Sequence, residues 1–275
     1  MKTTTALLLF GILCPSVGCT SQTLRSSSAS PYLGFAAYSN NHVDVFSFHS
    51  NQAALARIKN LSAGIYSEKR FFLNELTLYN ALVALPTRTG NFALDACSFG
   101  FTDYRETQLG LAYARSLGSK IDVGARFNYY SMNMPAYGSA SSINFDVGAI
   151  FRLTEKLNAG LHLYNPTRSK LGRSEEEKIP ASYSAGLGFE PSDKVFASVE
   201  IEKEEDQRVN VNAGLQYQFL SQFLTRLGVS TSSSLAYLGI GFKWRSMRLD
   251  AVASYHPQLG ITPALLIMTD IKKQH

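Results

Sequence analysis

The sequence predicts an all-β fold, a transmembrane antiparallel β-barrel of about fourteen strands with an N-terminal plug-like segment. Three observations carry this prediction. In residues 120–153, two long segments alternate apolar side chains with polar, charged or glycine residues, which is the period of a strand with one apolar face. Each segment has about ten residues or more, enough to cross a bilayer at a tilt, whereas strands of soluble sandwiches usually have five or six. The connections between such segments also alternate in length.

Residues 1–21 are predicted to be a secretory signal peptide. Lys2 precedes an apolar run from Ala6 to Cys14, and small residues follow up to Cys19. The run is too short for a membrane-spanning helix. Two processing routes stay open: cleavage near residues 19–22, or lipidation of Cys19, although Ser16 occupies the position where a lipoprotein signal normally has Leu.

The composition excludes several classes of function. Beyond the signal peptide, no window approaches the ~20 apolar residues of a spanning helix, so membrane insertion requires strands. The net charge of +5 is spread along the chain, which predicts no nucleic-acid partner. The sequence has no glycine-rich phosphate loop, metal-ligand spacing or nucleophile elbow, so we expect no cofactor, no metal, no catalytic residue and no enzymatic activity.

Residues 22–56 are predicted to form a polar, Ser-rich leader and then a compact plug-like segment in or under the barrel. The segment from Pro31 onward is too aromatic for a free linker and too irregular for a wall strand. Asn51 can cap a short helix that follows it. The candidate plug or gate residues are Phe35, Phe46, Phe48, Asn51, Gln52 and Ala53.

Residues 57–271 are predicted to form the barrel. The expected strands are 60–69, 74–86, 90–102, 105–117, 119–131, 141–154, 156–165, 180–190, 194–203, 207–219, 222–231, 234–245, 246–255 and 259–270. The apolar face of the third strand changes near Cys97, where we expect a bulge, and Cys97 itself is read as a packed strand residue. Short turns follow the even strands, and the two longest loops, 132–141 and 166–179, follow odd strands. This parity is typical of outer-membrane barrels of Gram-negative bacteria, and it places both barrel termini in the periplasm.

The polar face of the strands predicts the residues that line the lumen. The candidates are Asp122, Arg126, Asp146, Arg152, His162 and Arg208. Charges of both signs on this face indicate a filled, ion-paired interior, since an open ion-selective pore would favour one sign. Aromatic residues near strand ends on the opposite face indicate contact with outer-membrane lipids.

Two stretches resemble a known family. Residues 51–56, Asn-Gln-Ala-Ala-Leu-Ala, resemble the Asn-Pro-Ala-Gly-Leu-Ala box of the PorV/PorQ family of Bacteroidetes outer-membrane proteins, which are related to FadL-type fatty-acid transporters. Residues 255–263, Tyr-His-Pro-Gln-Leu-Gly-Ile-Thr-Pro, resemble the final-hairpin motif of that family. Gln52 stands where the family has Pro. The resemblance implies a plugged fourteen-stranded barrel and either a type IX secretion role or a channel for hydrophobic compounds.

Three hypotheses follow. The first is an accessory or scaffold barrel that binds secretion-system or other envelope proteins through its extracellular loops. The second is a FadL-like channel for a hydrophobic ligand, with the plug as its gate. An aromatic-lined pocket under the plug favours the channel, and a lumen packed shut with charge pairs counts against it. The third is a soluble periplasmic all-β protein, which strand length and aromatic placement disfavour.

Overall fold

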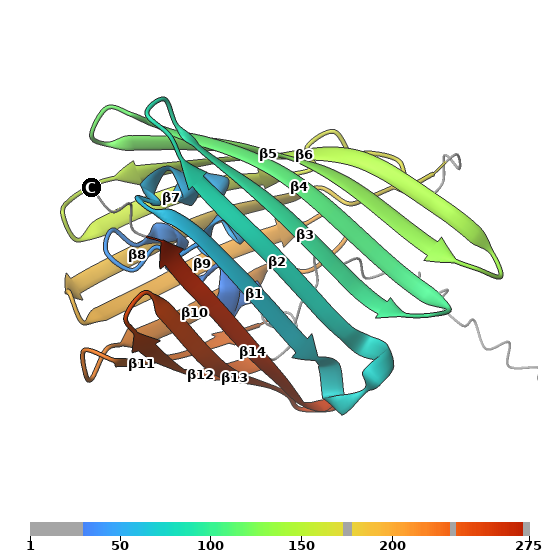
Figure 1. The fold of residues 1–275 in the computed structure, drawn as a ribbon. Coiled ribbons are helices and arrows are strands. Elements are labelled where there is room, and N and C mark those ends of the chain that lie inside the picture. The colour runs from blue at the N-terminus through green and yellow to red at the C-terminus, as the bar shows by residue number, and fades with distance from the viewer. Residues whose placement is uncertain (1–29, 173–177, 232–234, 272–275) are drawn as a thin grey trace, which may run out of the picture.

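The computed structural model describes residues 30–172, 178–231 and 235–271, and these residues form a closed antiparallel barrel of fourteen strands. Each strand pairs with its neighbours in sequence, and the first strand pairs with the last to close the wall, with Leu61 opposite Ile271. Figure 1 shows the strands inclined to the long axis of the barrel. The fold class expected from the sequence is therefore confirmed, while the predicted signal peptide lies outside the described residues.

All fourteen expected strands are present, and their ends differ from the expected ones by three residues at most. The strands are β1 (Leu61–Lys69), β2 (Thr77–Pro86), β3 (Asn91–Phe101), β4 (Tyr104–Leu117), β5 (Ile121–Met134), β6 (Gly138–Arg152), β7 (Leu157–Tyr164), β8 (Ser182–Ser192), β9 (Val195–Glu204), β10 (Asn210–Tyr217), β11 (Phe223–Ser230), β12 (Leu235–Trp244), β13 (Met247–His256) and β14 (Gly260–Ile271).

The structure corrects two details of the predicted wall. Residues 132–141 are not a long loop, because β5 and β6 stay paired up to Met134 opposite Gly138. These strands have 14 and 15 residues, longer than the ~10 that cross a bilayer, so their ends extend past the apolar band and lose the alternation that marks it. The bulge expected at Cys97 is absent, and its register with Asn80 and Gln108 is continuous. The apolar pattern changes there because the lumen face itself becomes apolar at Phe99, which is buried.

The outer face of the wall has the chemistry of a lipid-facing surface. Aliphatic side chains such as Ile65, Leu94 and Ile143 point outward and are 61 to 69% exposed. Exposed aromatic residues lie at both ends of the strands, for example Tyr79 and Tyr129 at one end and Trp244 at the other. An apolar band between two aromatic girdles is the pattern of a transmembrane barrel.

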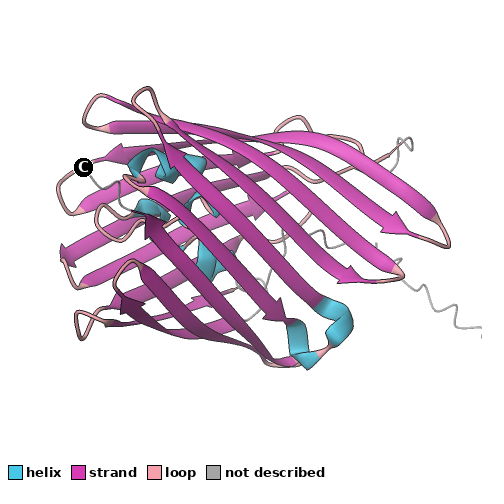
Figure 2. Cartoon of the chain, in the orientation of Figure 1, coloured by secondary structure: helices cyan, strands magenta, loops and turns pink. Residues whose placement is uncertain are grey.

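Helical segments lie inside the barrel and at one rim (Figure 2). Residues before the first strand form α1 (Ser30–Leu33) and the 3₁₀ helices η2 (Phe35–Tyr38), η3 (Ser47–His49) and η4 (Gln52–Arg57), all drawn within the wall near the end where β14 finishes. Two more, η5 (Arg70–Phe72) and η6 (Asn74–Leu76), connect β1 to β2 at the opposite rim. Among the described residues, no helix is long and apolar enough to cross a membrane.

Candidate functional site: the plug and the barrel lumen

The candidate site is the barrel lumen together with the segment that fills one end of it, residues 30–58, which we call the plug. Eight strands enclose a space that side chains alone just fill, so a fourteen-stranded wall needs additional chain to close its lumen. The plug supplies that chain, and its Phe46 and Phe48 are at most 1% exposed. Asn91, at the start of β3, donates through Nδ2 to the carbonyls of Leu55 and Ile58 at 2.7 and 2.8 Å. The plug therefore sits at the end of the barrel where the chain enters the wall.

Asn51 fixes the plug to the wall and also starts η4. Its Oδ1 accepts a hydrogen bond from the backbone N–H of Ala53 at 3.0 Å, which is an N-cap. Its Nδ2 donates to the carbonyls of Ala149 and Leu161 on β6 and β7. The wall approaches so closely because Gly148 has no side chain, since a β-carbon there would lie 2.2 Å from Asn51 Oδ1.

Gln52 and Ala53 also pack against the wall at a glycine. Both are fully buried, and a β-carbon at Gly124 of β5 would lie 2.5 Å from the Gln52 carbonyl carbon. Glycine on the lumen face of a strand thus has a specific purpose here: it admits the plug backbone.

The plug aromatics occupy slots that other lumen-facing glycines leave open. The Tyr38 ring lies against Gly160 and Gly186, where a β-carbon would come within 2.2 to 2.3 Å of ring atoms, and a β-carbon at Gly188 would lie 2.4 Å from the Tyr38 carbonyl oxygen. Phe35 lies against Gly214, and Phe46 lies against Gly64 in the same manner. The pattern of glycines on four different parts of the wall is complementary in shape to the plug.

A first cluster of ion pairs, the Asp44 cluster, joins the plug to β11 and β13. Asp44 Oδ2 lies 2.9 Å from Arg226 Nη2 and 3.1 Å from Arg248 Nη1. Arg248 also pairs with Asp250, which accepts a hydrogen bond from the Tyr32 hydroxyl at 2.8 Å. Two acids and two arginines balance their charges, as a buried cluster requires. Burial and the neighbouring Asp250 raise the pKa of Tyr32, so this phenol stays a hydrogen-bond donor.

A second cluster, the Asp122 cluster, holds the plug at β5, β6 and β8. Asp122 is fully buried, accepts from Arg57 Nε of the plug at 3.0 Å and pairs with Arg152. Arg152 donates in turn to Asn40 Oδ1 at 2.8 Å. Glu190 then accepts from the Asn40 backbone N–H at 3.0 Å and from two neighbouring plug groups. The two acids and two arginines again balance.

A third cluster, the Asp146 cluster, has unequal charges. Arg126 Nη2 lies 2.8 Å from Asp146 Oδ2, and Arg126 Nη1 lies 3.4 Å from Asp95 Oδ2. His49 of the plug places Nε2 3.9 Å from Asp95 Oδ1, and Gln52 Nε2 donates to Asp146 at 3.5 Å. Burial lowers the pKa of His49 although Asp95 acts in the opposite direction. With a neutral imidazole, the two acids and one arginine carry one net negative charge.

The structure thus brings four of the six predicted lumen residues against the plug: Asp122, Arg126, Asp146 and Arg152. His162 also faces the lumen from β7 and is 5% exposed. Arg208 does not. It is exposed in the connection before β10 begins, because the β9 to β10 pairing ends at Asn210 opposite Glu202 while the alternating pattern continues beyond it.

Sequence reasoning missed several plug contacts. Asp44, Arg57 and Glu190 were not singled out, and Asp95 was obscured by the changing pattern around Cys97. One signal was available for Asp44, which is the first acidic residue of the chain and stands inside an aromatic segment. A charge in such a segment needs a buried partner. Nothing in the sequence identifies Arg226 and Arg248 as that partner.

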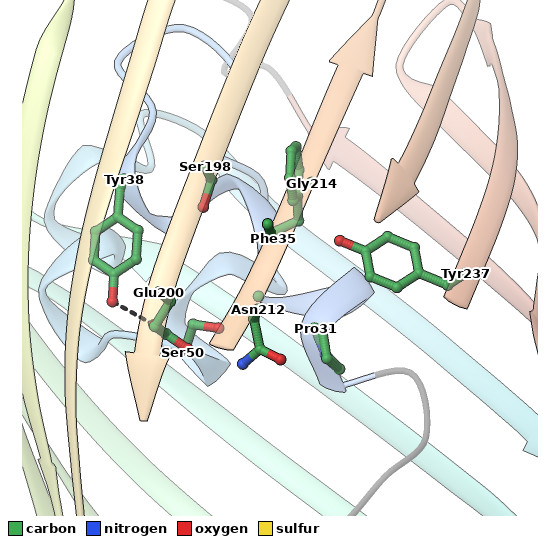
Figure 3. A pocket seen from close by; sticks show the side chains of 11 residues that line it. Pro31, Phe35, Tyr38, Ser50, Ser198, Glu200, Asn212, Gly214 and Tyr237 are labelled. Atoms are coloured by element: carbon green, nitrogen blue, oxygen red, sulfur yellow. Dashed lines mark hydrogen bonds between the residues drawn. The ribbon is translucent and has the colours of Figure 1, made fainter. Parts of the chain in front are cut away.

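A small cavity of about 20 Å³ remains between the plug and strands β9, β10 and β12. Figure 3 shows the rings of Phe35, Tyr38 and Tyr237 around it, with the Tyr38 hydroxyl bonded to Glu200 at 2.5 Å. The volume accommodates a water molecule but not a hydrocarbon. The aromatic-lined pocket that would favour a channel is therefore represented, among the described residues, by a water-sized cavity beside the plug that is too small for a hydrocarbon ligand.

The far end of the lumen is narrowed by an apolar cluster. Leu171 and Ile179, in the long connection between β7 and β8, are 7% and 2% exposed and pack with lumen-facing wall residues. Asn165 Nδ2 holds the connection by donating to the Ile179 carbonyl at 2.7 Å. The same cluster continues to Phe46 and Phe48 of the plug. One continuous apolar core therefore extends from this connection to the plug.

Comparison with solved structures places this architecture among known barrels. A FadL homologue of Pseudomonas aeruginosa has a TM-score of 0.67 at 13% identity, covering 89% of this chain and 98% of that one. The CymD monoaromatic hydrocarbon channel has a TM-score of 0.61 at 14% identity, covering 85% and 94%. The Pseudomonas putida toluene transporter TodX has a TM-score of 0.58 at 10% identity, covering 82% and 94%.

No family model and no curated protein matches the sequence. At these identities the likeness shows the fold, which is that of the FadL-type outer-membrane barrels. The comparisons give no support to the narrower resemblance to PorV/PorQ or to a type IX secretion role.

Proposed function

We propose that this chain is an outer-membrane channel for hydrophobic small molecules, closed at rest by its plug. The observation that carries the proposal is the apolar cluster that extends from the β7 to β8 connection to the plug aromatics. Once the plug moves, these buried side chains would line the passage, where a hydrophobic solute gains apolar contacts and an ion or sugar loses hydration. The fold shared with hydrocarbon channels supports the same reading.

A lumen packed with charge pairs is an argument against a channel, so the positions of these pairs relative to the plug decide how strong that argument is. Two of the three ionic clusters pair charges across the boundary between plug and wall, and the Asp146 cluster contacts the plug through the neutral side chains of His49 and Gln52. We infer that these contacts hold the plug in place at rest. When the plug moves, water or other charged groups can take the place of the lost partners. In the proposed orientation, the plug and the short turns face the periplasm, and the β7 to β8 connection faces outward.

Uptake by intact cells tests the proposal. Cells with a complete lipopolysaccharide layer, with and without the chain, are exposed to 1-N-phenylnaphthylamine, an uncharged aromatic dye that fluoresces in apolar surroundings. The chain is expected to raise the rate of dye entry several-fold and to leave entry of a charged hydrophilic dye unchanged. Equal rates for the aromatic dye, with the barrel folded in the outer membrane, would contradict the proposal.

The scaffold hypothesis makes a different prediction for the same cells. Affinity purification from native membranes in mild detergent would recover a stoichiometric envelope protein, and dye entry would not depend on the chain. These two readouts separate the hypotheses, because a channel needs no partner and a scaffold needs no flux.

A further inference from the structure

We propose that the outer wall carries a built site for an anionic glycerophospholipid, with an acyl chain in a hollow over β14, β1, β2, β3 and β4 and the phosphate at a basic rim. The inference rests on membrane insertion of the barrel and not on transport through it. Its first basis is an apolar hollow of about 630 Å³ in this part of the wall. That volume lies within the roughly 300–1,000 Å³ of small-molecule sites.

The hollow opens on the lipid side. The lumen side of the same strands is filled, since Leu82 and Met268 are 3% and 7% exposed and Phe46 covers Gly64. On the outer side, Ala81 pairs with Ala96 and with Ile65 across the strands, and Ala63 lies one step along on β1. These three alanines form a shallow floor.

Larger side chains border the floor. Ile65 and Leu94 are 61% and 63% exposed, and Ile267 on β14 lies directly opposite Ile65. The alanine floor and the branched side chains around it form an irregular apolar groove. A flexible hydrocarbon chain can follow such a groove closely, whereas a rigid partner would leave part of it empty.

Basic residues lie in the turns and the entering segment at the barrel end where β14 finishes, on the same side of the barrel as the hollow. Arg88 in the β2 to β3 turn, Arg245 in the β12 to β13 turn and Lys59 before β1 are all exposed. The Arg245 guanidinium lies 5.5 Å from the Trp244 ring, the type of residue that anchors a barrel at the headgroup level. Met247 and Ala63, which line the hollow, are two and four residues from Arg245 and Lys59. The basic side chains therefore lie at the depth of a lipid phosphate whose acyl chain enters the hollow.

Charge favours a lipid over a second copy of this chain. Among the described residues of this rim, the exposed acid Asp270 is already bonded to Ser62 at 2.6 Å. A symmetric dimer through this face would set the arginines and lysine of one copy against those of the other, and two concave surfaces would not fill each other. A lipid phosphate neutralises these cations. Each Lys or Arg near the membrane surface raises the affinity for an anionic lipid by a factor of about five.

Two double variants test the two halves of the site, each with a matched control elsewhere on the barrel. Ala81→Leu with Ala96→Leu fills the floor, and Ala159→Leu with Ala185→Leu adds the same bulk on the lipid face of β7 and β8. Arg88→Gln with Arg245→Gln removes two rim charges, and Lys156→Gln with Lys194→Gln removes two from turns on other parts of the same end.

Purified chain is titrated with palmitoyl-oleoyl phosphatidylglycerol or phosphatidylethanolamine and analysed by native mass spectrometry. The unmodified chain is expected to retain one phosphatidylglycerol about tenfold better than phosphatidylethanolamine. Both site variants lose about tenfold in retention, and both controls keep it.

Three outcomes would overturn the proposal. The chain could retain the two lipids equally, or the site and control variants could retain phosphatidylglycerol equally. The chain could also form a dimer that dissociates in the Ala81→Leu variant. Dye entry is not part of this readout. Failure of the lipid site therefore leaves the channel proposal standing, and failure of the channel leaves the lipid site standing.

Discussion

The wall and the plug are held in place by different kinds of interaction. The wall is a closed ladder of backbone hydrogen bonds, and the pairing of β1 with β14 leaves no free edge. The plug has only short helices and depends on a few side chains, notably Asp44, Asn51 and Arg57. A single substitution should therefore release the plug without opening the wall.

The largest expected effect comes from Asp44→Asn. It leaves Arg226 and Arg248 buried with Asp250 as the remaining acid of the cluster, and breaking a buried ion pair typically costs about 3–5 kcal/mol. Plug release is followed as maleimide labelling of a cysteine at buried Ala54, in a chain whose Cys97 and Cys19 are serine. Labelling should accelerate about a hundredfold, while the shift in gel migration on boiling, the sign of a folded barrel, is kept.

The control for Asp44→Asn is Asp193→Asn, in the exposed turn between β8 and β9. It removes the same charge and should leave labelling unchanged. Loss of the migration shift in the Asp44 variant would mean that the plug and the wall fold as one unit, against the distinction drawn above.

A smaller effect is expected from Gly186→Val. The new side chain enters the slot of Tyr38, whose ring atoms would lie 2.2 Å from the β-carbon. Overpacking of this kind costs about 1–3 kcal/mol, so labelling at residue 54 should accelerate about tenfold. Ala185→Val, on the opposite face of the same strand, is the matched control and should match the parent chain. Equal labelling in the two variants would show that the glycine slots do not seat the plug.

Acidification should have the smallest effect, acting through His49. Burial lowers its pKa in the docked plug, while a released plug regains a pKa of about 6.5. The released state therefore binds the proton more readily, so docking is strongest above about pH 6.5 and weakens as the pH falls below it. The charged groups that face His49 are Asp95, Arg126 and Asp44. Labelling, divided at each pH by the rate measured for a free thiol so that the loss of thiolate cancels, should accelerate between about pH 7 and pH 5.

His49→Gln should flatten this pH dependence, and His256→Gln, in the last position of β13 at the other end of the barrel, should leave it intact. If the labelling rate depends on pH in the same way in the parent and the His49 variant, other groups cause the dependence. If the rate does not depend on pH in either chain, the prediction is wrong.

The wall was predictable because its chemistry repeats. Outward residues such as Phe127 and Leu187 must be apolar and alternate with lumen residues, so period two locates the strands to within three residues. The alternating pattern gave a wrong prediction only where the environment of a strand face changes along the strand. The β5 to β6 hairpin extends past the apolar band, and the lumen face of β3 turns apolar at Phe99.

The site was only partly predictable. Lumen charges such as Asp122 and Arg152 follow from strand parity, and the capping pattern identifies Asn51. The partners of these residues do not follow, because Asp44 and Arg226 are brought together only when the closed wall surrounds the plug. The glycines of the lumen face likewise look like simple interruptions of a strand until Tyr38 is placed against Gly186.

The most direct test of the central claim, that passage requires the plug to move, is to lock it. Asn51→Cys with Gly148→Cys joins the plug to β6, where a β-carbon on residue 148 would lie 3.0 Å from Asn51 Cγ, and Cys97 and Cys19 are replaced by serine. With the disulfide formed, entry of 1-N-phenylnaphthylamine should fall to that of cells without the chain, and reduction with dithiothreitol should restore it. Each single-cysteine chain should be indifferent to the reductant. Equal dye entry before and after reduction, with the disulfide demonstrated, would contradict the account.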